Sequence, residues 1–195
     1  PLKSKITGAI AAWEWGAYLG EEGMEKGIKC TISSWTRIDS RMLPPHAKCS
    51  GNYANSILAK MDAIASGYDE AILLSPNGFV AEGSGENIFR VRDGAVMTPS
   101  TAAGILEGIT RDSVLQIARD SGITVSEKDF TREDIFTSDE LFFSGTAANV
   151  TPIRDVDNRP IGAGQYPITK RIQRTYLDAI HGRLPKYKQW LSYAR

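Results

Sequence analysis

Apolar residues recur at helical spacing in three stretches of the chain. From Asn52 onward they return every three or four positions until Gly67, so this stretch predicts a helix that the glycine ends. A second helix is predicted over residues 110–121, and a third begins at Pro167 and runs to about His181. The intervening segments change to the period of two that is typical of strands.

The strand pattern contains two hairpin signals. Asn77-Gly78 and Asp93-Gly94 each separate two apolar runs, which favours tight turns between antiparallel strands. Alternating or continuous apolar runs predict strands over residues 29–37, 70–75, 79–82, 87–92, 95–98, 123–130 and 140–144. Residues 13–25 are typical of a turn followed by a helix, and Pro44-Pro45 excludes regular structure over residues 42–51.

The order of these elements predicts a mixed α+β fold in one domain over residues 1–195. Strict alternation of strand and helix is absent, so a doubly wound parallel sheet is not expected. The hairpin-rich pattern instead favours a mixed sheet or pseudo-barrel with helices packed on it. The first residue is Pro1 and no signal peptide follows, so we expect a processed chain or part of a longer protein.

Composition narrows the functional classes. The 23 basic and 23 acidic residues give a formal net charge of zero, which argues against a nucleic-acid partner. Cys30 and Cys49 form no C-x-x-C pair, and with only His46 and His181 besides, no metal site is predicted. We expect two reduced thiols in a cytoplasmic protein, and no apolar run approaches the length of a membrane span.

Lys48 and Glu82 are the first candidates for chemistry. Lys48 lies in a small-residue segment between the two prolines and a predicted helix, although a lone lysine is usually a solvated surface residue. Glu82 opens the segment EGSGENIF, in which two glycines allow close approach of the backbone to a ligand. The alternatives for that segment are a plain turn and, more weakly, a dinucleotide site, since a glycine is missing at Ile88 and a strand follows.

Two further segments could bind an anion. Residues 104–111 (GILEGITR) run directly into a predicted helix, where backbone N–H groups and the Thr110 hydroxyl are available. The simpler alternative is that Thr110 is an ordinary N-cap. Residues 143–148 (FSGTAA) leave a strand through small residues that could present N–H and hydroxyl groups to a phosphate or carboxylate, or form a plain turn.

These segments together, in this order and spacing, resemble the class IV (fold-type IV) aminotransferases. The motifs that carry the resemblance are EGSGENIF at residues 82–89, VMTP at 96–99 and LEGITR at 106–111. The stretches WGAY at 15–18 and SSW at 33–35 look like the branched-chain subgroup. The resemblance implies the large, cofactor-carrying domain of the D-amino-acid-aminotransferase-like fold, and it implies that a smaller N-terminal domain, which supplies an arginine for the cofactor phosphate, is missing here.

The resemblance also implies roles for individual residues toward the cofactor pyridoxal 5'-phosphate (PLP). Lys48 matches the Schiff-base lysine, Tyr53 the tyrosine on the phenolic oxygen, and Glu82 the carboxylate at the pyridine nitrogen. The remaining matches are Leu106 on the cofactor ring, Gly108, Ile109, Thr110 and Thr146 at the phosphate, Thr146 and Ala147 at the substrate carboxylate, and Trp15 in the wall of the side-chain pocket.

The implied reaction moves the amino group of leucine, isoleucine or valine to 2-oxoglutarate, catalysed by a homo-oligomer with small-molecule substrates only. Two activities of the same fold remain as alternatives, a D-amino-acid aminotransferase and an aminodeoxychorismate lyase. A third alternative is of another class: a binding or assembly module, or a fragment that is inactive because the smaller domain is absent. Lys48 and Glu82 argue against a non-catalytic role for the parent protein.

Overall fold

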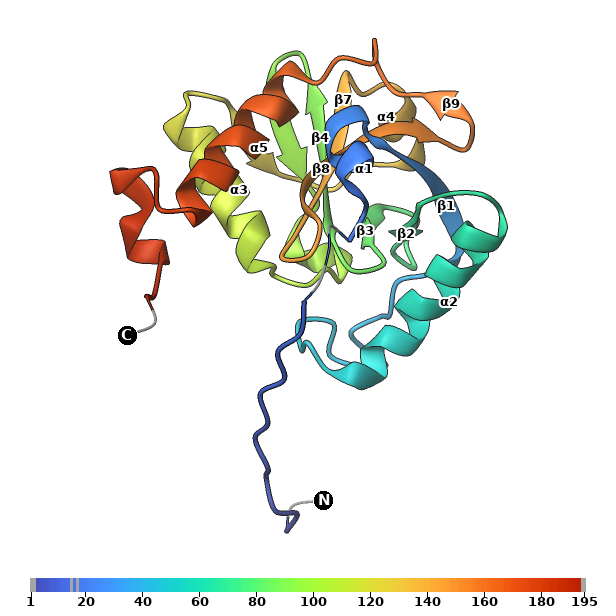
Figure 1. The fold of residues 1–195 in the computed structure, drawn as a ribbon. Coiled ribbons are helices and arrows are strands. Elements are labelled where there is room, and N and C mark those ends of the chain that lie inside the picture. Colours follow the sequence, from blue (N-terminus) through green and yellow to red (C-terminus); the bar gives the residue numbers. More distant parts are fainter. Residues whose placement is uncertain (1–2, 15, 17, 194–195) are drawn as a thin grey trace.

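The computed structural model describes residues 3–14, 16 and 18–193. Its helices cover the flanks of a single mixed sheet (Figure 1). The α-helices are α1 (Glu21–Lys26), α2 (Tyr53–Ala65), α3 (Ile109–Asp120), α4 (Arg132–Phe136) and α5 (Pro167–Ile180). The short 3-10 helices are η1 (Ser50–Asn52), η2 (Thr101–Ala103) and η3 (Pro185–Trp190).

The strands of the described residues join into one nine-stranded sheet. They are β1 (Ile28–Thr36), β2 (Glu70–Leu74), β3 (Val80–Gly83), β4 (Asn87–Arg92), β5 (Ala95–Thr98), β6 (Val125–Glu127), β7 (Glu140–Gly145), β8 (Asn149–Val156) and β9 (Arg159–Pro160). The predicted mixed α+β fold is therefore confirmed. Strand 123–130 is shorter than predicted, because only residues 125–127 lie beside β5.

Six of the strands form a closed ring. The order β3-β2-β1-β8-β7-β4 is completed by a pairing of β3 with β4, so the predicted pseudo-barrel is confirmed. The β3–β4 pairing consists of one residue pair, Glu82 opposite Asn87, which we call the closing seam. The seam is short because β4 runs on beside β5 after its first residues. β1 lies parallel to both β2 and β8, whereas the other ring pairs are antiparallel.

Alternation along the strands produces two cores on opposite faces of the sheet. In β4, Ile88 belongs to the core inside the ring, to which all six ring strands contribute. Phe89 faces the other way, stacks on Phe142 with ring centroids 4.8 Å apart, and packs under α3 and α5. The two helices lie together on that face (Figure 1), so the sheet is covered there and filled within.

α2 packs on the β1 and β2 side of the ring with an unusual distribution of residues. Its buried positions are the small residues Ser56, Ala59 and Ala63. The large apolar residues that gave the helix its predicted spacing point outward, and Ile57, Leu58, Met61 and Ile64 are all exposed. Small inward residues let the helix approach the strands closely. The periodicity therefore identified the helix, while its broad apolar face is the solvent-facing one.

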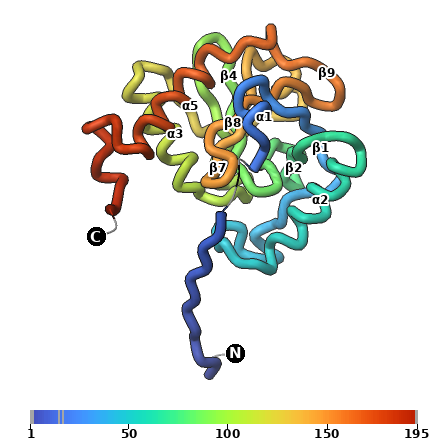
Figure 2. The backbone as a smooth tube through the Cα atoms, viewed as in Figure 1, coloured from blue at the N-terminus to red at the C-terminus, as the bar shows by residue number. Residues whose placement is uncertain are grey.

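The N-terminal residues and three elements differ from the expectations. Residues 3–14 extend away from the ring as a segment without helix or strand (Figure 2). The helix predicted within residues 13–25 is confined to α1. The sequence patterns did not predict α4, β8 or β9. None of the helices within the described part of the chain is long and apolar enough to cross a membrane.

Gly162 offers a test of the packing around β9. Its φ is +56° and a Cβ there would collide with the carbonyl oxygen of Asp139, whereas Gly164 has φ +70° with open space around it. Gly164→Ala should lower the free energy of unfolding by about 1 kcal/mol through backbone strain alone. Gly162→Ala should lower it further, because the collision is added. Urea denaturation checks this, and equal midpoints for both variants would contradict the predicted contact.

Candidate active site

A cavity of about 800 Å³ lies at the closing seam. The loop before α2, the N-terminus of α3 and the turn between β7 and β8 complete its wall. The cavity brings together nine residues singled out from the sequence: Lys48, Tyr53, Glu82, Leu106, Gly108, Ile109, Thr110, Thr146 and Ala147. The tenth, Trp15, lies outside the described residues.

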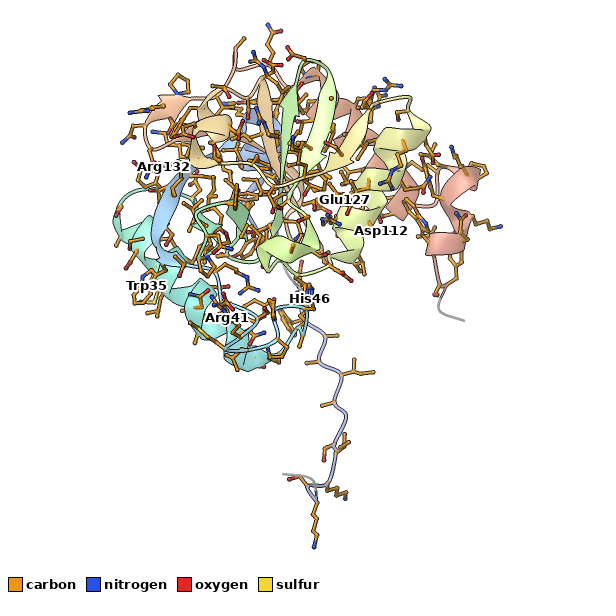
Figure 3. All side chains as sticks on the ribbon, turned by 180° about the vertical axis from the view of Figure 1, so that it is seen from behind. Trp35, Arg41, His46, Asp112, Glu127 and Arg132 are labelled. Atoms are coloured by element: carbon orange, nitrogen blue, oxygen red, sulfur yellow. The ribbon has the colours of Figure 1, made fainter. Side chains whose placement is uncertain are left out.

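Lys48 and Tyr53 form one side of the cavity. Asn52 pins the preceding loop, because its Nδ2 donates to the carbonyls of Pro44 and Ala47 at 3.0 and 2.9 Å. Tyr53 begins α2, and Lys48 Nζ donates to its hydroxyl at 2.9 Å. The loop and the helix end therefore hold an amine and a phenol in contact. His46, which Figure 3 labels, comes from the same loop and also lines the cavity.

Glu82 stands at the closing seam and accepts three hydrogen bonds. Arg37 Nε donates to Oε1 at 2.6 Å, while the Leu106 N–H and Asn87 Nδ2 donate to Oε2 at 3.0 and 3.1 Å. The carboxyl group is buried, and burial raises its pKa to about 7, although the Arg37 charge, the hydrogen bonds from the Leu106 N–H and Arg37, and the Lys48 charge lower it. A carboxylate has about four acceptor positions, so one position on Oε1 is left for a further donor.

Gly108 makes room for this arrangement. Asn87 Nδ2 also donates to the Leu106 carbonyl at 2.8 Å, which places the amide against the backbone that leads into α3. A Cβ at residue 108 would collide with Asn87 Oδ1. The glycine therefore has a steric reason to stand at this position, and it allows Asn87 to hold both Glu82 and the loop.

The opposite end of the cavity is rich in hydrogen-bond donors. The first N–H groups of α3 have no acceptor within the helix, and the N-cap residue Gly108 has no side chain that could accept from them. The interpretation of Thr110 as the N-cap is wrong, since it is the second helical residue; its hydroxyl lies 3.5 Å from that of Tyr176. Among the described residues, buried Ser144 Oγ has no hydrogen-bond partner.

Glu86 is a second buried carboxyl group in the cavity wall. Its Oε2 accepts a hydrogen bond from the Gly85 N–H at 3.1 Å, and a Cβ on Gly83 would come within 2.6 Å of that oxygen. Burial and, next, the charge of Glu70 raise the pKa of Glu86 to about 8. Glu70 itself is paired with Lys60 Nζ at 2.7 Å. Glu86 is therefore largely protonated at neutral pH.

Arg37, Asn87, Ser144 and Glu86 line the cavity but were not assigned roles from the sequence. Asn87 and Glu86 belong to the motif at residues 82–89, so the motif itself was the available signal. Arg37 had no local signal, because it reaches Glu82 only through the pairing of β1 with β2 and of β2 with β3. The dinucleotide-site interpretation of the motif is wrong, because β4 and not a helix follows it.

Comparison with known proteins agrees with this geometry. The family model described as amino-transferase class IV matches residues 1–156. A branched-chain-amino-acid aminotransferase of Pseudomonas aeruginosa is 48% identical over 187 residues, which is 95% of this chain and 61% of the relative. The Escherichia coli K12 protein of the same name is 44% identical over 183 residues, or 93% of this chain and 59% of the relative.

Solved structures agree as well. The branched-chain aminotransferase from Thermoproteus uzoniensis, crystallised with norvaline, superposes with a TM-score of 0.88 at 48% identity, covering 93% of this chain and 59% of that one. The branched-chain amino acid aminotransferase from Thermobaculum terrenum, in its PLP form, superposes with a TM-score of 0.83 at 42% identity, covering 85% of this chain and 54% of that one.

The chain belongs to the class IV aminotransferase family. It spans about 60% of the length of the curated relatives it matches. The chain is therefore similar to one large part of each of these relatives.

The raised pKa of Glu86 predicts a pH dependence of stability. A carboxyl group whose pKa is higher in the folded than in the unfolded state stabilises the fold below pH 4.5, and that contribution is lost as the pH rises toward 8. Glu86→Gln removes the titration, so the variant should gain stability relative to the parent as the pH rises from about 5 to 8. Chemical denaturation at several pH values measures this. Glu21→Gln, at an exposed position, is the control, and parallel stability curves for parent and E86Q would contradict the prediction.

Proposed function

We propose that this chain is the cofactor-binding part of a PLP-dependent branched-chain amino acid aminotransferase. The observation that carries the proposal is the arrangement of one cavity, in which the Lys48–Tyr53 pair, the buried Glu82 and the α3 N-terminus all line the wall. Family membership and the named relatives support it.

The residues present fit the cofactor at each of its ends. Lys48 offers an amine, the unused acceptor position on Glu82 Oε1 suits the N–H of a protonated ring nitrogen, and the uncapped α3 offers N–H groups to a phosphate. The unpartnered Ser144 hydroxyl is one more donor at the wall. PLP, when bound, supplies a carbonyl group that condenses with amines and a ring that accepts electrons.

Lys48 Nζ has two tasks in this proposal. With the cofactor bound, Lys48 Nζ would hold it, and the same amine, when free, would serve as the general base for the proton on the substrate Cα. Its contact with the Tyr53 hydroxyl restricts the flexible side chain to one direction. A lysine placed this way can accept a proton at Nζ and donate it again, which the transfer of an amino group requires.

Glu82 and the N-terminus of α3 would interact with different ends of the bound cofactor. An ionised Glu82 keeps a ring nitrogen protonated and so favours the withdrawal of electrons from the substrate Cα. The helix N-terminus and the Thr110 hydroxyl bind the phosphate, and Thr146 with Ala147 binds it or the substrate carboxylate from the turn between β7 and β8. Leu106, which lines the cavity, would pack on the ring of the bound cofactor.

The substrate assignment follows the names of the relatives. We infer transfer of an amino group from leucine, isoleucine or valine to 2-oxoglutarate. A homo-oligomer and a cytoplasmic location stay predictions.

Lys48→Ala tests the cofactor assignment. After incubation with PLP and removal of the free cofactor, the parent chain should retain the visible absorbance of bound PLP. K48A should lose this absorbance, because the covalent attachment is gone. Lys188→Ala, at an exposed lysine, is the matched control and should behave like the parent. Retention of the absorbance in K48A would show that another residue holds the cofactor, and its absence in the parent chain would favour a non-catalytic module.

A panel of amino donors tests the substrate assignment. In a form extended to the full length of the relatives, L-leucine, L-isoleucine and L-valine should each support formation of glutamate from 2-oxoglutarate, measured by a coupled assay. The apolar donors should be preferred, because the relatives are named for branched-chain amino acids. Exclusive use of D-alanine would contradict the branched-chain assignment in favour of a D-amino-acid aminotransferase.

A further inference from the structure

Arg37 and Glu82 form an ion pair that is closed off from solvent. Arg37 Nε lies 2.6 Å from Glu82 Oε1, and each side chain is only 7% exposed. Arg37 follows β1 directly, 45 positions before its partner. Among the described residues, Arg37 forms its ion pair with Glu82, so the two charges compensate each other locally.

The side chain of Arg37 is poorly explained by stability alone. Its backbone N–H already bonds to the Leu74 carbonyl at 2.8 Å, so the end of β1 is fixed without the guanidinium. Its Nη1 is buried, and among the described residues it has no hydrogen-bond partner. Such a group loses its hydration without full compensation, and a buried ion pair is often no more stable than an apolar substitute.

The position of Arg37 matters for the ionisation of its partner. Burial raises the pKa of Glu82 to about 7, and the Arg37 charge is the largest influence that opposes this rise. Asn87 and the Leu106 N–H contribute hydrogen bonds but no charge. The Lys48 charge also lowers the pKa of Glu82, but less than Arg37 does, and the Glu82 charge in turn raises the pKa of the neighbouring Glu86. Loss of Arg37 therefore shifts the Glu82 carboxyl group toward its neutral form.

We propose that Arg37 is a positioning residue that favours the ionised form of Glu82 and turns Oε1 toward the cavity. Arg37 and the cofactor ring nitrogen then share Oε1, while Asn87 and the Leu106 N–H hold Oε2. This inference rests on the proposed function for its catalytic consequence. Its electrostatic part concerns the chain alone and is tested without cofactor.

The first experiment follows the Glu82 carboxyl group by ¹³C NMR in the cofactor-free chain, with Glu82→Gln to assign the signal. Arg37→Gln should raise the titration midpoint by roughly 1 to 3 pH units, the usual effect of an opposite charge at this distance. Arg37→Lys keeps the charge and should restore most of the shift, although the lysine lacks the planar fork. Asn87→Ala removes a neutral donor and should move the midpoint much less. Equal midpoints in R37Q and N87A would overturn the proposal.

The second experiment uses the PLP-loaded, full-length form. R37Q should reduce kcat by about the same factor as E82Q while KM for the donor changes little, and the double variant should lose no more than E82Q alone, because both changes remove the same carboxylate. Additive losses would overturn the proposal. If R37Q alone fails to fold, R37Q/E82Q removes both charges and tests whether the unpaired carboxylate is the cause, while R37K carries the titration. Failure of the parent to bind PLP would contradict the proposed function and leave the NMR result standing.

Discussion

The pairing of Glu82 with Asn87 is the constraint on which the structure depends. It is one residue pair wide, and it closes a ring of six strands. The same two side chains then meet again as acceptor and donor at 3.1 Å, so sheet closure and the electrostatics of the cavity use the same residues. The backbone pairing determines the position of the Glu82 carboxyl group. Arg37, which directly follows β1, favours its ionised form.

Burial of carboxyl groups gives this cavity its chemical character and has an energetic consequence. Glu82 and Glu86 are both buried, and both have raised pKa values. Glu82 is compensated by an arginine, whereas Glu86 accepts one backbone hydrogen bond and faces the Glu70–Lys60 pair. The pKa values of both groups are raised by burial, but the opposing influences differ: the Arg37 charge lowers that of Glu82, whereas the Glu70 charge raises that of Glu86 further.

Much of the fold could be predicted from local patterns, and the reasons for the failures are physical. The Asn77-Gly78 and Asp93-Gly94 turns and the helices α3 and α5 have strong local signals, and they were placed correctly. β8 was missed because it contains Pro152, which argues against a central strand. In the structure Pro152 pairs with β7, and β1 begins to pair only at Ile153, so no hydrogen bond to β1 is lost there. Arg37 was not predicted as a site residue because its partner Glu82 is distant in the sequence. The two residues meet only because the ring of strands closes.

Gly108 and Asn87 have a consequence for how this site can change. Any side chain at position 108 occupies the space that the Asn87 amide fills, and the amide donates to both Glu82 and the Leu106 carbonyl. The two positions are therefore epistatic: a larger residue at 108 is tolerated only after position 87 has become smaller, and that first step already loosens Glu82. Substitutions at positions 87 and 108 must therefore occur in a fixed order. Libraries that vary each position alone will miss the pairs of substitutions that fold.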